Sequence, residues 1–183
     1  MSEPSNSWRV AEATPSWRLS SGDFLDVNVW LILSYRSHEF HAVASRYWQS
    51  ACESGTPLWF SRGTMMGLVR LLVQPRVMGP DVMTIHQALD VYHKWLDTSQ
   101  VALLPEPPGF DDALTRLMGI ASAPLPAHLW TDLCFAATAE AAGLRMVTFD
   151  RDFERFGLAR CLALAGCGLP DEAMGRSGMM AFW

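Results

Sequence analysis

With 183 residues, half of them apolar and 18% charged, the chain is most simply one domain, large enough to form a hydrophobic core without disulfides. Its formal net charge of −5 excludes a general electrostatic attraction to nucleic acid and leaves only a local basic patch for that purpose. The opening "MSEPSNSWRV" lacks the features of a signal peptide, and no apolar run reaches the roughly 18 residues of a membrane span, so we expect a cytoplasmic protein.

The N-terminal half predicts short strands that alternate with helices. Residues 1–20 are rich in Ser, Pro and Trp without periodicity, and we interpret them as an N-terminal extension. The apolar run "DFLDV" (23–27) predicts a first strand, and "NVWLILSY" (28–35) predicts a short helix directly after it. Three elements follow: a helix capped by Ser37 that extends to Gly55, a strand over 57–61, and a helix over 63–75 that stops at Pro75.

The C-terminal half continues the alternation. The clearest helix lies in residues 79–97, where apolar residues recur at helical spacing and Pro80 and Asp81 stand at the start. Later strands are expected over 101–105, 144–149 and 160–164, and helices over 110–119 and 126–143, the last closed by Gly143. Since no hairpin signals occur, the pattern predicts an α/β fold with a parallel sheet of four to five strands. The domain is expected over 21–164, with 165–183 as a C-terminal tail.

The four cysteines do not indicate a metal site or a disulfide framework. Cys52, Cys134, Cys161 and Cys167 form no CxxC pair, and each lies in an apolar segment. Reduced thiols in the core of a cytosolic protein are the favoured interpretation.

Three aspartates are expected to meet at one edge of the sheet. Asp26 closes the first strand, Asp150 closes the fourth, and Asp132 lies in the first turns of the helix before that strand. In an open parallel sheet, ligands bind beyond the carboxyl ends of the strands. Carboxylates that converge there repel one another unless a hard cation such as Mg²⁺ or Mn²⁺ joins them. Taken singly, each aspartate is equally well explained as a turn residue or a helix cap.

Several blocks of the sequence and their spacing, in order, resemble the PIN domain, and in particular the VapC-type toxins of toxin–antitoxin modules. They are "FLDVNVWLILSYRSHEFHAVASRYW", "GLVRLLVQP", "LWTDLCFAATAEAAGLRMVTFDRDF" and the spacing that joins them, over roughly residues 22–164. The resemblance implies a three-layer α/β/α fold and a ribonuclease that depends on Mg²⁺ or Mn²⁺. It further implies an RNA substrate, inhibition by a cognate antitoxin protein, and a homodimer.

The resemblance also assigns roles to individual residues. Catalytic roles are implied for five residues that match the family's motifs: Asp26, Asn28, Asp132, Thr148 and Asp150. The implied metal ligands are Asp26, Asp132, Asp150 and Asp152. Arg62 and Arg151 lie beside these blocks and are candidates for contact with RNA phosphates, although a solvated surface position explains each of them as well.

One residue departs from the family pattern. The block "TMMGLVRLL" aligns with a helix that usually supplies a further acid just before the glycine, and here that position is Met65. Methionine is a soft ligand that does not hold Mg²⁺. Two interpretations therefore stay open: an active nuclease with one carboxylate fewer, or a degenerate domain that binds RNA or an antitoxin without cleavage.

A phosphatase of the haloacid-dehalogenase type is a competing interpretation, because such enzymes also begin with an Asp after an apolar strand. That chemistry requires a second Asp two residues later and a lysine near the phosphoryl group. Here Asn28 occupies the second position, and Lys94, the only lysine, lies on the periodic helix away from any strand end. The sequence therefore favours the nuclease.

Overall fold

The structure, a computed structural model, describes residues 21–120 and 125–164, so the expected terminal extensions lie outside the described residues. Its centre is a five-stranded sheet in which every neighbouring pair is parallel, in the order β3-β2-β1-β4-β5. The strands are β1 (Asp23–Leu25), β2 (Leu58–Phe60), β3 (Val101–Leu103), β4 (Arg145–Thr148) and β5 (Cys161–Ala163). The predicted parallel sheet is confirmed.

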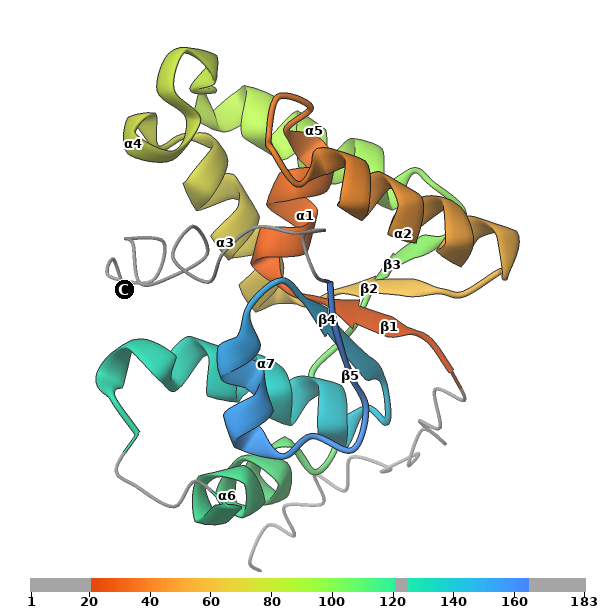
Figure 1. Cartoon of the computed structure of the whole chain (residues 1–183), viewed down its shortest axis with the longest axis vertical. Coiled ribbons are helices and arrows are strands. Elements are labelled where there is room, and N and C mark those ends of the chain that lie inside the picture. The colour runs from red at the N-terminus through yellow and green to blue at the C-terminus, as the bar shows by residue number, and fades with distance from the viewer. Residues whose placement is uncertain (1–20, 121–124, 165–183) are drawn as a thin grey trace, which may run out of the picture.

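Helices cover both faces of the sheet and make three layers (Figure 1). One layer contains α1 (Val27–Ser34), α2 (His41–Glu53), α3 (Arg62–Leu72), α4 (Pro75–Met78) and α5 (Ile85–Leu96). The other contains α6 (Phe110–Ile120) and α7 (Trp130–Ala141). Short 3₁₀ turns are η1 (Gly79–Asp81), η2 (Ala127–Leu129) and η3 (Arg151–Phe156). The α/β/α architecture expected from the resemblance is thus confirmed.

Each face of the sheet has its own apolar core. On the side of α1, the buried Trp30 ring stacks on Phe60 of β2, with ring centres 3.8 Å apart and planes at 12°. On the side of α7, Phe24 of β1 meets Phe135 edge-on at 6.1 Å. Phe24 and Leu25, adjacent in β1, belong to different cores, so they point to opposite faces of the sheet, and β1 is fully buried at its centre.

Three helix boundaries differ from the sequence prediction. Ser37 caps no helix: α2 begins at His41, after Phe40, which makes no side-chain cap. α3 stops at Leu72, before Pro75 is reached. Pro75 is the first residue of α4, a position where the backbone N–H that proline lacks would have no partner within the helix. Pro80 lies in η1, and α5 starts instead behind Thr84, which forms a reciprocal capping box with Gln87.

An ion pair between the exposed Arg145 and the buried Asp23 joins β4 to β1 at the amino end of the sheet. The Asp23 carboxylate accepts hydrogen bonds from Arg145 Nε at 2.8 Å and from the Tyr47 hydroxyl at 2.6 Å. Burial and the adjacent Asp23 raise the pKa of Tyr47 well above its usual range. Since Asp23 is only 2% exposed, this network satisfies a carboxylate that would otherwise destabilise the core.

The described cysteines are reduced, but they are not all in the core. Cys52 and Cys134 are half-buried, and Cys161 on the edge strand β5 is exposed, so the core position expected for Cys161 is wrong. Cys167 lies outside the described residues. Within the described ranges, no helix has the length and hydropathy needed to cross a membrane.

Candidate active site

Asp26 is the centre of a buried polar network at the carboxyl end of the sheet. It follows β1 directly and caps α1, because its Oδ1 accepts a hydrogen bond from the Val27 N–H at 2.6 Å. Its other oxygen, Oδ2, accepts from Asn28 Nδ2 at 2.6 Å and from the Thr148 hydroxyl at 2.7 Å. The helix cap therefore explains one oxygen, and the second is held by side chains of two different segments.

Asn28 and Thr148 join this network to the end of β4. Asn28 Nδ2 also donates to Thr148 Oγ1 at 3.1 Å, and its Oδ1 accepts from the Phe149 N–H at 3.2 Å. Thr148 is fully buried, and its hydroxyl accepts in turn from the Asp150 N–H at 2.9 Å. The amide and the hydroxyl thus fix where the Asp26 carboxylate and the Asp150 backbone lie relative to each other.

Asp150 and Asp152 form a turn at the end of β4. Asp150 caps η3 by accepting from the Asp152 N–H at 2.8 Å, and Asp152 pairs with Arg155 at 2.9 Å. Burial raises the pKa of Asp150, while that backbone hydrogen bond and the positive charges of Arg155 and His128 act in the opposite direction. Asp150 therefore has the capping role that its position in the sequence also allowed, alongside any functional role.

Asp132 is the least satisfied carboxylate of the group. It lies in the first turn of α7, is 4% exposed, and its Oδ2 has no hydrogen-bond partner. Burial, followed by the negative charges of Asp26, Asp150 and Asp152, raises the pKa of Asp132 to about 8. Burial likewise raises the pKa of Asp26 to about 6, with Asp150 adding to the effect against three opposing hydrogen bonds. The carboxylates therefore act on one another electrostatically.

The donor set fits a hard divalent cation more than any other group. Its atoms are carboxylate, amide and hydroxyl oxygens, which Mg²⁺ and Mn²⁺ prefer, and the orphaned Asp132 Oδ2 is an unpaired acceptor among them. Among the described residues, however, no three His, Cys, Asp or Glu side chains are arranged closely enough to hold a metal ion by themselves. Such spacing suits an ion that keeps several waters and is held by one or two carboxylates.

Basic side chains lie around the acidic group, and one of them was missed by the sequence interpretation. Arg62, the first residue of α3, and Arg151, the first residue of η3, are both exposed. His128 of η2 is also exposed, and its positive charge lowers the pKa of Asp150. The only signal for His128 was its position four residues before Asp132 in "HLWTD", which is too weak a pattern to distinguish it from a surface histidine.

Met65 lies in the first turn of α3, half-buried, and packs against the core on the α1 side. We expect Met65→Glu to tighten Mn²⁺ binding about tenfold, because it adds the carboxylate that the aligned helix usually supplies. Calorimetric titration of the chelator-treated protein measures the change. Met66→Glu is the matched control, since it adds the same charge to the same helix at a side chain that is 55% exposed. Equal affinities in both variants would show that position 65 does not face the acidic group.

Comparison with known proteins gives a consistent result. The profile of the PIN domain matches residues 24–158. The chain is 31% identical over 135 residues to Ribonuclease VapC41 of Mycobacterium tuberculosis, an alignment that covers 72% of this chain and 91% of that protein.

Solved structures share the fold at low sequence identity. VapBC2 from Rickettsia felis bound to a promoter DNA fragment superposes with a TM-score of 0.59 at 12% identity, over 78% of this chain and 98% of that one. VapC20 of Mycobacterium tuberculosis, described as a sarcin-ricin loop cleaving toxin, gives 0.53 at 17% identity, over 75% and 97%.

Proposed function

Because the chain belongs to the PIN domain family, we propose that it is a metal-dependent endoribonuclease and the toxin of a VapBC-type toxin–antitoxin module. The observation that supports this best is the acidic group itself. Asp26, Asp132 and Asp150 come from three segments of the chain. Burial, together with the negative charges of Asp26, Asp150 and Asp152, raises the pKa of Asp132 to about 8. A core position that served only stability would not combine an unpaired carboxylate oxygen with three other carboxylates.

The proposed chemistry is hydrolysis of RNA phosphodiester bonds. A bound Mg²⁺ or Mn²⁺ supplies charge neutralisation for the phosphate and a water molecule of lowered pKa. Asp26, Asp132 and Asp150 are the residues that would hold the ion, with Asp152 at the edge of the group. Asn28 and Thr148 orient the Asp26 carboxylate through hydrogen bonds of 2.6 and 2.7 Å, so both are positioning residues. Arg62 and Arg151 supply positive charge for the RNA backbone.

The alternative, a degenerate domain that binds RNA or an antitoxin without cleavage, rests on Met65. We consider it the weaker candidate, because the loss of one acid leaves Asp26, Asp132 and Asp150 in place. Mg²⁺ ordinarily retains several waters and does not require a complete cage of protein ligands.

A metal add-back assay separates these two functions. Purified full-length protein, freed of any antitoxin and treated with EDTA, is incubated with structured RNAs, and cleavage is expected only after Mn²⁺ or Mg²⁺ is restored. Binding without cleavage under every metal condition would favour the degenerate domain. Cleavage that continues in EDTA would contradict the metal dependence and would indicate a contaminating, metal-independent ribonuclease.

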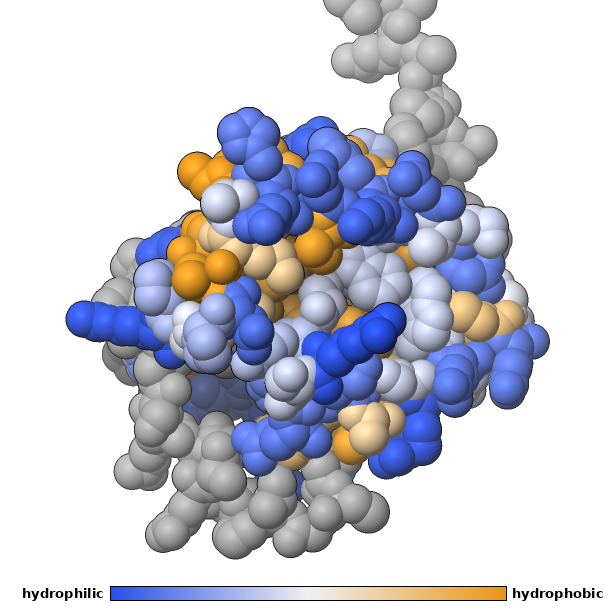
Figure 2. Space-filling view, turned by 90° about the horizontal axis from the view of Figure 1, so that it is seen from above, coloured by the Kyte–Doolittle hydropathy of each residue, from blue (hydrophilic) through white to orange (hydrophobic). Residues whose placement is uncertain are grey.

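The proposed module also requires a protein partner. Two large apolar side chains at the start of α5 are exposed, Val82 at 41% and Ile85 at 61%. Figure 2, which looks onto the side of the molecule that carries α4 and α5, shows apolar residues gathered beside strongly hydrophilic ones. An apolar area with a polar border is typical of a surface that binds another protein. We expect a cognate antitoxin and a second copy of this chain as the partners, in the cytoplasm.

A further inference from the structure

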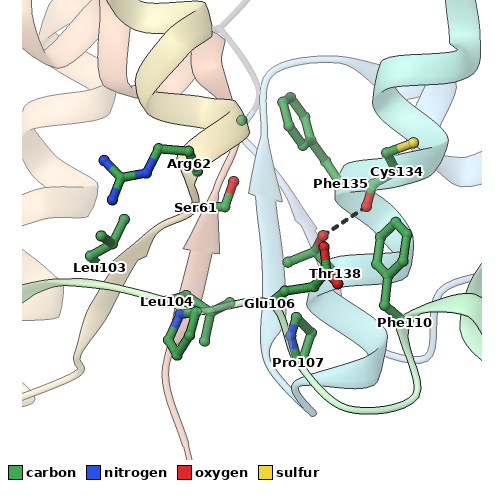
Figure 3. A pocket seen from close by; sticks show the side chains of 12 residues that line it. Ser61, Arg62, Leu103, Leu104, Glu106, Pro107, Phe110, Cys134, Phe135 and Thr138 are labelled. Carbon is green, nitrogen blue, oxygen red and sulfur yellow. Dashed lines mark hydrogen bonds between the residues drawn. The ribbon is translucent and has the colours of Figure 1, made fainter.

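A pocket of about 510 Å³ opens at the carboxyl ends of β2 and β3, against α7, the helix that also carries Asp132 (Figure 3). Ser61 and Arg62, where α3 begins, form one side, and Phe110, Phe135 and Thr138 from α6 and α7 form the other. The segment after β3, including Leu104 and Pro107, forms its base. This volume lies within the ~300–1,000 Å³ range of small-molecule sites.

We propose that this pocket binds one base of the RNA strand, next to the phosphate that the acidic group acts on. The inference rests on the proposed function and names a subsite for its substrate. Its occupant is a flat heteroaromatic ring, recognised by stacking on the half-buried Phe110 ring, by the apolar wall that includes Phe135, and by polar groups at the rim.

The pocket and the acidic group share a helix and a sheet edge. Asp132 and Phe135 are three residues apart on α7 and are therefore neighbours on its surface. Asp26 follows β1, which pairs directly with β2, and β2 pairs with β3. Since adjacent strands lie about 4.8 Å apart, the ends of β2 and β3, where the pocket opens, are roughly 5 and 10 Å from the end of β1. This separation corresponds to the first or second nucleotide beyond a phosphate placed there.

The aromatic wall is held in a fixed position. Phe135 is 6% exposed and packs edge-on against Phe24 of β1. A Cβ atom added at Gly63 would lie 3.0 Å from Phe135 Cε1, so a larger residue there would require the ring to shift by a few tenths of an ångström. Thr138 is fixed as well, because its hydroxyl donates to the Cys134 carbonyl at 2.9 Å. A preformed apolar wall of this kind suits a planar ligand, since little ordering is needed on binding.

The rim carries the charges that a nucleotide requires. Arg62 is exposed and lines the pocket, where its guanidinium can stack on a base or contact the adjoining phosphate. Glu106, also exposed at the rim, is an acceptor for an exocyclic amino group. These features favour RNA over an apolar protein side chain, which would leave both charges without a role.

Binding of RNA in the absence of metal tests this proposal without any cleavage. The full-length protein in EDTA is titrated with fluorescein-labelled single-stranded RNAs of ten nucleotides, intact or with a single abasic position, and fluorescence anisotropy gives the Kd. Stacking of one base predicts that affinity falls about 5- to 100-fold when one particular base is missing and changes little at the other positions.

Two variants remove the pocket in different ways. Thr138→Phe fills it and Phe110→Ala removes a ring, and in both the intact RNA should bind as weakly as the abasic RNA, with no further loss when the base is absent. Thr115→Phe on α6 is the matched control, because Thr115 is exposed and lies outside the pocket, and it should behave as the wild type. Circular dichroism verifies that each variant folds.

The outcomes distinguish a wrong pocket from a wrong function. If either folded variant keeps the wild-type affinity for RNA and the wild-type loss of affinity at the abasic position, the proposal is overturned. The same holds if such a variant keeps its affinity for RNA but no longer binds an antitoxin. Wild-type protein that shows the base-dependent affinity but never cleaves with Mn²⁺ would retain the pocket and contradict the nuclease. Wild-type protein that cleaves with Mn²⁺ while pocket variants bind RNA unchanged would retain the nuclease and contradict the pocket.

Discussion

Asp150→Asn is expected to reduce Mn²⁺-dependent RNA cleavage at least about 100-fold, equal to ~2.7 kcal/mol of transition-state stabilisation, while the fold stays intact. The fold is preserved because an asparagine Oδ1 can still accept the hydrogen bond from the Asp152 N–H that caps η3. What the substitution removes is the negative charge. Initial rates at saturating Mn²⁺ and thermal unfolding of the same preparation provide the two measurements.

Asp26→Asn is expected to abolish cleavage as fully but to disturb the site more. Its amide group would place a donor where Oδ2 now accepts from Asn28 Nδ2, so two donors would face each other. Asp111→Asn, at an exposed position in the first turn of α6, is the control and should cleave normally. Cleavage that persists unchanged in both site variants would mean that another site or another protein performs it.

These variants change residues that were already candidates from the sequence. Asp26, Asp132 and Asp150 were placed by strand ends and by family motifs, and the structure puts them where their charges act on one another. The parallel order was predictable for the same reason: short apolar runs alternate with amphipathic helices, and that periodicity is local information. Secondary structure that depends on residues close together in the chain was predicted correctly for most elements.

The features that the sequence did not reveal depend on contacts between distant segments. Tyr47 and Arg145 are ordinary surface residues by type, and only the pairing of β1 with β4 brings them to Asp23. The pocket is formed by α3, α6 and α7, and no spacing in the sequence signals it. The periodic apolar pattern of α5 was also misleading at its start, because Ile85 is 61% exposed while Ala88 is buried. Periodicity identifies a helix but not which residues a neighbour will cover.

The burial of Asp132 links metal binding to stability, and we expect Asp132→Asn to remove the pH dependence of stability that this residue causes. In the folded protein burial and neighbouring charges raise the pKa of Asp132 from 3.8 to about 8, so the folded state binds more protons than the unfolded state between those values. Stability contributed by this group is therefore present at low pH and is lost as the pH rises through 8. The pKa of Asp26 is raised to about 6, so the stability contributed by Asp26 is already largely lost at pH 6.

Between pH 6 and 8, the metal-free wild type should thus lose about 1–2 kcal/mol that Asp132→Asn retains, or roughly 3–6 °C in Tm. Adding Mn²⁺ at pH 8 should raise the Tm of the wild type more than that of the variant, because the cation offsets a charge that the variant lacks. Differential scanning fluorimetry across pH, with the exposed Asp90→Asn as the control, measures both effects. Parallel Tm curves for wild type and Asp132→Asn, with equal responses to Mn²⁺, would show that this carboxylate neither carries the buried charge nor shares a cation with Asp26 and Asp150.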